Sequence, residues 1–175
     1  ISLTDDVVPI DIKAGIQCSP IYKASNVAIE YNTVMKFGSD TDSAGVQIAS
    51  QSVAGQDHDR ISVKGNRVNG TVIGTNVVAT ASCGLGRVSV IENEFIDLTP
   101  GDVFSVPIGV SVLASSAISE LVHERNRTVD DRDSAQTQYG SYMGGEIEVL
   151  RRSENVSRGV TVADHSEIAL AVTRR

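Results

Sequence analysis

Tryptophan is absent from this 175-residue chain, and aromatic residues make up only 4% of it. A core built around large rings is therefore disfavoured. The apolar residues are mainly Val, Ile and Ala, which pack well on pleated strands. Cys18 and Cys83 are expected to lie two coil spacings apart, roughly 9.6 Å, which is too far for a disulfide, so we predict two free cysteines. No apolar run approaches the roughly 18 residues of a membrane-spanning helix, so no such span is expected.

Basic residues are also in short supply, because 15 Lys and Arg stand against 22 Asp and Glu, for a net charge of −7. No basic stripe is available to neutralise phosphates, which disfavours nucleic acid as a partner. No signal peptide is recognisable. The chain begins with Ile1 and soon enters a strand-like segment, so we expect a single domain over residues 1–175 that is a piece of a longer chain.

A repeat centred on asparagine is the main positive signal. Four short segments alternate apolar and small residues and then end in Asn: Val27–Asn32, Ile61–Asn66, Val88–Asn93 and Leu121–Asn126. A fifth copy, Val160–His165, has His in place of Asn. Alternation at period two over such short runs indicates strands.

A second repeat lies upstream of each copy. Three of its members finish in Ala-Ser, a fourth is looser and a fifth is shorter: Val46–Ser50, Val78–Ser82, Ser111–Ser115, Ile147–Arg152 and Gly15–Cys18. A third short stretch follows each Asn. The two markers recur at nearly the same period of about 33 residues, which is typical of a solenoid with three strands in each coil.

The sequence therefore predicts an all-β fold, a right-handed parallel β-helix of about five coils with three short strands per coil. The second strands should point Val and Ile inward. The asparagines at the corner tolerate the left-handed conformation, and stacked amides form hydrogen-bonded ladders. We interpret this row as structural rather than as a binding site: Asn32, Asn66, Asn93 and Asn126.

With these repeats, the chain from Gly15 to about Val172 resembles the pectate-lyase-like superfamily of parallel β-helices. Its long coils, irregular loops and small residues along one sheet look most like bacteriophage tail-spike and tail-fibre proteins. The resemblance implies binding, or cleavage, of bacterial surface polysaccharide. It also implies a homotrimer on the virion tail, assembled in the host cytoplasm. A secreted or cell-surface protein is the alternative location.

Loop carboxylates are the candidates for catalysis by a polysaccharide lyase or glycoside hydrolase. The richest cluster is Asp57, His58, Asp59 and Arg60, which combines carboxylates with an imidazole and a guanidinium. Such clusters also hold Ca²⁺. Asp is however a common turn former, and for each cluster we favour the turn over catalysis. No zinc motif is present, and no cofactor is predicted.

Ligand-binding candidates lie in the longest insertion, Asp130 to Gly145, which combines acidic residues with tyrosines among Gly and Ser: Asp130, Asp131, Asp133, Tyr139 and Tyr142. Loops on a rigid scaffold often carry function. Asp40 and Asp42 fall in an equivalent loop. The tyrosines serve equally well to pack against the side of the solenoid. His123 stands at an inward position and is expected in the core.

We predict a receptor-binding or structural segment of a phage tail spike that recognises bacterial surface polysaccharide. A polysaccharide lyase or glycoside hydrolase and a cell-surface adhesin are the alternatives. The first strands of coils three to five have apolar or small residues on both faces, so one face should expose a column of Val, Ile and Ala. Burial of that column against other copies would favour the trimer.

Overall fold

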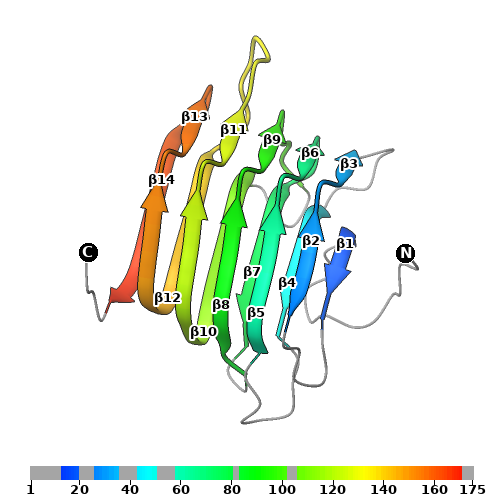
Figure 1. Ribbon diagram of the computed structural model, residues 1–175. Coiled ribbons are helices and arrows are strands. Elements are labelled where there is room, and N and C mark those ends of the chain that lie inside the picture. Colours follow the sequence, from blue (N-terminus) through cyan, green and yellow to red (C-terminus); the bar gives the residue numbers. More distant parts are fainter. Residues whose placement is uncertain are drawn as a thin grey trace.

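The computed structural model describes residues 13–19, 26–35, 43–50, 58–80, 83–101 and 106–170. Within these ranges every regular element is a β-strand, and no helix that could cross a membrane is present. The strands run parallel and stack side by side along one axis, from β1 at one end to β14 at the other (Figure 1). The protein is a parallel β-helix, as the repeats predict.

Three strands build each of the first three coils. The first strands are β1 (Lys13–Cys18), β4 (Ser43–Ala49) and β7 (Ile73–Ala79). The second strands are β2 (Val27–Glu30), β5 (His58–Lys64) and β8 (Leu85–Ile91). The third strands, continued through coils four and five, are β3 (Thr33–Met35), β6 (Arg67–Asn69), β9 (Glu94–Ile96), β11 (Arg127–Val129) and β13 (Val156–Arg158).

Coils four and five depart from the prediction of three short strands. Their first and second strands are fused into β10 (Ile108–Glu124) and β12 (Tyr139–Ser153). The N-terminal part of β10 pairs with β7 and its C-terminal part pairs with β8. The first and second strands therefore form one bent nine-stranded sheet, and the third strands form a separate five-stranded sheet.

The predicted fifth copy of the asparagine repeat is wrong. Val160–His165 is not a second strand, because β14 (Val162–Leu170) pairs with the first part of β12 and opens a further coil. The segment Ile147–Arg152, predicted as a first strand, instead pairs with the second-strand part of β10, where Ile147 lies beside Ile118. Both segments of the last predicted coil are therefore assigned to the wrong strand type, each by one strand.

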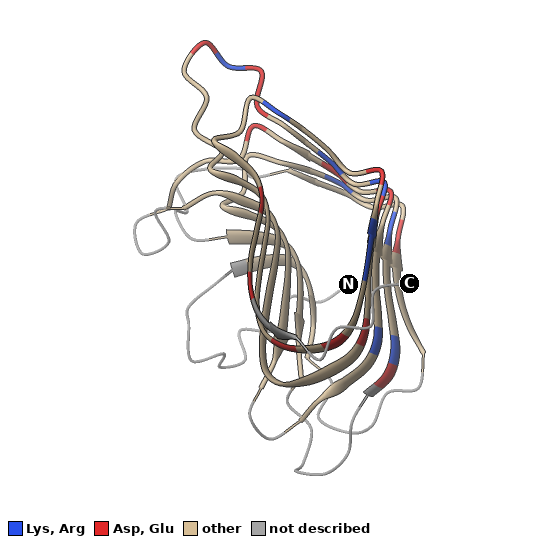
Figure 2. Ribbon diagram, turned by 90° about the vertical axis from the view of Figure 1, so that its left-hand side faces the viewer, with Lys and Arg blue, Asp and Glu red and all other residues tan. Residues whose placement is uncertain are grey.

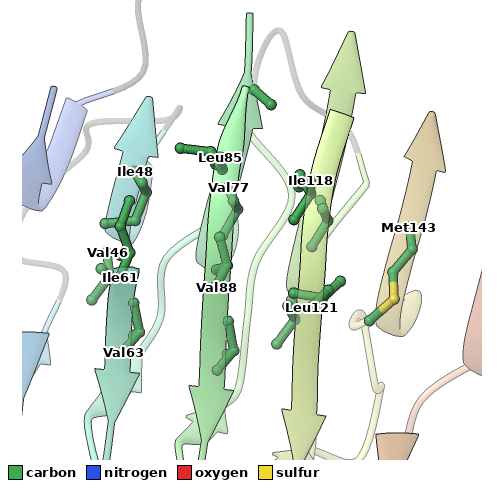
Figure 3. Packing of buried hydrophobic residues seen from close by; sticks show 14 of the residues in the cluster. Val46, Ile48, Ile61, Val63, Val77, Leu85, Val88, Ile118, Leu121 and Met143 are labelled. Carbon is green, nitrogen blue, oxygen red and sulfur yellow. The ribbon is translucent and has the colours of Figure 1, made fainter. Parts of the chain in front are cut away.

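The core lies between the two arms of the bent sheet and the third strands. Val46, Ile48 and Val77 point inward from first strands and meet Val63 and Val88 from second strands (Figure 3). All five are fully buried. Burying each such side chain contributes about 1.5–3 kcal/mol. The inward assignment of the second-strand residues agrees with the alternation in the sequence.

A column of glycines, missed in the repeats, sets the distance between the first and third strands. Each member would place a Cβ against the middle residue of the third strand in its own coil: Gly15, Gly45, Gly74, Gly109 and Gly140. At Gly74 that Cβ would overlap the ring of Phe95 and the carbonyl oxygen of Gly109. Only glycine permits this approach of the two sheets.

The asparagines form a ladder along the axis in which each amide joins neighbouring coils. Nδ2 of Asn66 donates to the carbonyl of Ile29 at 2.9 Å and to Oδ1 of Asn93 at 3.0 Å. Oδ1 of Asn66 accepts from the backbone N–H and from Nδ2 of Asn32. The rungs are Asn32, Asn66, Asn93, Asn126 and Asn155.

Asn155 is a rung that the sequence repeat does not predict, because the repeat puts His165 at that corner. The left-handed residue of each corner is also not the asparagine itself. Positive φ angles occur one position earlier, at 57° in Tyr31 and in Glu92, and at 64° in Gly65. The asparagine is therefore selected for its amide, which can donate and accept at once, and not for its tolerance of a left-handed backbone.

The exposed column of Val, Ile and Ala expected on the first strands is absent from the described residues. Val77, Val110, Val112 and Ile147 face the interior and are fully buried. On the outer face Leu113 is 41% exposed. The packing argument for a trimer therefore loses its premise, because the strands place this apolar column inside.

Candidate functional site

Two tyrosines and a histidine gather on the outer face of the first strands, at the end of the stack where β12 and β14 lie. The register places Tyr142 between Ser111 of β10 and His165 of β14. Tyr139 begins β12 and lies on the same side of the sheet, since its ring centroid is 5.9 Å from that of Tyr142. Both tyrosines lie in a strand rather than in the loop predicted to hold them.

The three rings form a compact cluster. The rings of Tyr142 and His165 are stacked, with centroids 5.2 Å apart and planes inclined by 18°. Tyr139 meets Tyr142 edge to face at 66° and lies 5.6 Å from His165. Tyr139, Tyr142 and His165, together with Glu167, are called the ring platform below. Because the platform belongs to two adjacent paired strands, its geometry is held by the sheet.

Glu167 connects two of these rings. Its carboxylate accepts a hydrogen bond from the hydroxyl of Tyr142 at 3.2 Å, and its other oxygen lies 3.0 Å from Nε2 of His165. These bonds, that with His165 first, lower the pKa of Glu167 below its ordinary value. Burial, followed by the bond to Glu167, raises the pKa of Tyr142. At neutral pH the platform therefore presents an ionised carboxylate beside a neutral phenol.

Beside Tyr142 the sheet carries a residue without a side chain, Gly144. Gly144 pairs with Leu113 on one side and with Glu167 on the other. A Cβ at Gly144 would meet nothing nearer than Cε1 of Tyr142 at 3.5 Å and Cδ2 of Leu113 at 3.9 Å. Aromatic rings with one carboxylate beside them can contact a small polar molecule that carries C–H surfaces.

The acidic loop between β11 and β12 is folded on itself. Asp130 is buried and its carboxylate accepts bonds from Arg132, from the backbone N–H groups of Gln136 and Thr137, and from the Thr137 hydroxyl. The bond from Arg132 above all lowers the pKa of Asp130 far below its usual range. This carboxylate holds the loop together and has no oxygen left for a ligand.

The other two loop carboxylates are exposed. Asp131 pairs with Arg158 of β13 at 2.5 Å, which ties the loop to the next coil. Asp133 is exposed near the tip of the loop. Both belong to the loop that follows the third strands, whereas the ring platform lies on the first strands. The structure therefore separates the predicted ligand-binding set into a loop and a platform.

The predicted catalytic cluster lies elsewhere on the molecule. Asp57 falls outside the described residues, as do Asp40 and Asp42, and of His58 only the backbone is described. Asp59 and Arg60 are exposed at the start of β5, where Arg60 pairs in register with Arg87. Across the described residues, no group of three His, Cys, Asp or Glu side chains is arranged to hold a metal ion.

The interior becomes polar at the same end of the stack. His123 occupies the inward position predicted for it, is 2% exposed, and lies in register with Val90 and Arg152. Arg152 lies 3.8 Å from the carboxylate of Asp164 and 3.3 Å from the hydroxyl of Ser141. Burial, with the nearby Arg152, lowers the pKa of His123 to about 4. The histidine is therefore neutral at physiological pH.

Sequence patterns found two of the four platform residues. The repeat predicts His165 at a corner and Glu167 in a third strand, because it assigns the last segments of the chain to the wrong strands. They lie 23 and 25 residues after Tyr142, a separation without any local signal. Only the pairing of β12 with β14 brings them together. No family model, no curated protein and no solved structure matches this chain.

Proposed function

We propose that this chain is a carbohydrate-binding β-helix, the receptor-binding segment of a phage tail spike or tail fibre, and that the ring platform contacts bacterial surface polysaccharide. The observation that carries the proposal is the cluster of Tyr139, Tyr142 and His165 with Glu167 on a rigid sheet. Aromatic faces pack on the C–H faces of sugars, and a carboxylate accepts bonds from sugar hydroxyls.

The rigidity of the scaffold supports this assignment. A platform built on paired strands is ordered before the ligand arrives, so binding costs little conformational entropy. The tail-spike assignment rests on the resemblance in coil length and loops. A homotrimer and a location on the virion tail follow from the same resemblance and are part of the proposal.

The direct test is binding of the purified chain to a panel of bacterial capsular and lipopolysaccharide glycans. Tyr142→Ala should weaken the binding roughly tenfold or more, because it removes the central ring contact. Tyr31→Ala is the matched control, since Tyr31 is 69% exposed at the other end of the stack. Binding that is equally strong in the parent and in Tyr142→Ala would contradict the proposal.

A polysaccharide lyase or glycoside hydrolase is the second candidate. It is favoured by the hydrogen-bonded series Tyr142–Glu167–His165, in which a phenol and an imidazole flank a carboxylate. Release of oligosaccharides from a bound glycan, abolished by Glu167→Gln, would establish this activity. Release that is lost in Asp59→Asn instead would return catalysis to the cluster at the start of β5. Binding to glycans of a host cell, rather than to bacterial glycans, would favour the third candidate, a cell-surface adhesin.

A further inference from the structure

Positive charge is segregated on this solenoid. In the first strands from β4 to β14, including the first parts of β10 and β12, no Lys or Arg occurs. The described basic side chains lie instead on second strands, third strands, corners and the loop after β11: Arg60, Lys64, Arg67, Arg87, Arg125, Arg127, Arg132, Arg151, Arg152 and Arg158. Viewed along the stack, they follow the opposite side and the upper edge (Figure 2).

Most of these basic groups are already paired with carboxylates. Glu94 lies between Arg67 and Arg127, at 3.3 and 2.8 Å. Glu120 lies likewise between Arg87 and Arg151. On this side of the solenoid, Glu94 and Glu120 are thus each shared by two guanidinium groups of neighbouring coils. The positive charge there is largely neutralised by these carboxylates.

The ring platform has the opposite balance of charge, with a carboxylate and no Lys or Arg. Glu167 is its only described carboxylate on the outer face, and the Tyr142 ring beside it presents a negative quadrupole. Arg152 approaches Ser141 from the interior side of the same sheet and lies near Asp164, so it does not neutralise Glu167. A ligand cation at the platform would meet a carboxylate beside an aromatic ring. The one described platform group that can carry positive charge is His165, which lies 3.0 Å from Glu167 and is charged only when protonated.

We infer that the ring platform selects amino sugars, whose ammonium group pairs with Glu167 beside the ring of Tyr142, and that it discriminates against uronic acids and phosphorylated sugars. This inference rests on the proposed function and adds the class of sugar. An ammonium group over an aromatic ring is attracted to it, and more strongly when water is partly excluded. An anionic sugar would be repelled by Glu167.

The test uses three β-1,4-linked hexamers with one backbone: glucosamine, glucose and glucuronic acid. Binding to the intact chain is measured by calorimetry at low salt and at about pH 7, where an amine as acidic as an α-amino group is still mostly protonated and an ordinary imidazole is mostly neutral. The glucosamine hexamer should bind about fivefold to tenfold more tightly than the glucose hexamer, and the glucuronate hexamer most weakly. Raising the salt should reduce the advantage of glucosamine.

Glu167→Gln tests the residue, because it removes the charge and keeps the shape. The variant should bind glucosamine and glucose hexamers equally well. Glu148→Gln, at another exposed glutamate, which lies on β12, is the matched control and should retain the preference. Tighter binding of glucuronate than of glucosamine by the parent would overturn the inference and leave glycan binding intact. Absence of binding to every hexamer and every bacterial glycan would overturn the proposed function as well.

Discussion

The side-chain amide and the backbone N–H of Asn93 both donate to one atom, Oδ1 of Asn126, at 3.0 and 3.1 Å. The same amide also donates to the carbonyl of Val63 in the preceding coil at 3.0 Å. The coils on either side of Asn93 are thus joined through its buried side chain. Neither Asp nor Ala reproduces this arrangement, since Asp lacks the donor and Ala lacks both groups.

Asn93→Ala should therefore lower the free energy of unfolding by roughly 2–4 kcal/mol, because buried backbone groups of Asn66 and Val63 lose their partners. Chemical denaturation measures the change. Asn32→Ala is the control, because Asn32 is the half-buried end of the ladder, and it should cost less than half as much. Equal costs at the two positions would mean that the ladder is not what stabilises the corner.

Gly74→Ala should destabilise the protein by about 3 kcal/mol or more, because the new methyl group overlaps Phe95 and the backbone of Gly109. Gly144→Ala, in the same sheet, should change the stability by less than about 0.5 kcal/mol, since its Cβ meets only ordinary contacts. Thermal melts of the two variants give the comparison. Similar melting temperatures would show that the glycine column does not set the spacing of the sheets.

His123 should make the protein sensitive to acid. Its pKa is about 4 when folded and ordinarily 6.5, so between these values the unfolded chain binds a proton that the folded chain does not. The free energy of unfolding should fall as the pH decreases from 6.5 to 4, by about 3 kcal/mol from this group. His123→Val, which matches Val90 in the same column, should lose that part of the pH dependence in denaturation curves. An unchanged difference between pH 7 and pH 4 would contradict the buried neutral histidine.

The intact protein should form a trimer, with three times the 18.5 kDa mass of one chain. Light scattering at micromolar concentration measures this mass. The expectation now depends on the resemblance to tail spikes, because the apolar column that first motivated it faces inward. A stable monomer would remove the trimer from the proposed function and leave the ring platform unaffected.

Much of the fold follows from residues that are close in the sequence. Alternation of Val and Ile with small residues marks the second strands, and recurring Asn marks their ends, because each strand must bury one face against the coil above and below it. The glycine column was also readable, since Gly15, Gly45, Gly74, Gly109 and Gly140 recur at spacings of 30, 29, 35 and 31 residues.

The sequence by itself thus determined a parallel β-helix, the inward residues of its second strands, and Tyr139 and Tyr142 as candidate binding residues. Only the tertiary structure decided that Tyr142 stacks on His165 and bonds to Glu167, and that the Asp130 carboxylate is consumed within its own loop. The physical reason is register. Which residues of neighbouring coils meet depends on the lengths of the connections between strands. A shift of one strand moves His165 from a predicted corner to the ring platform, although the local sequence pattern is the same.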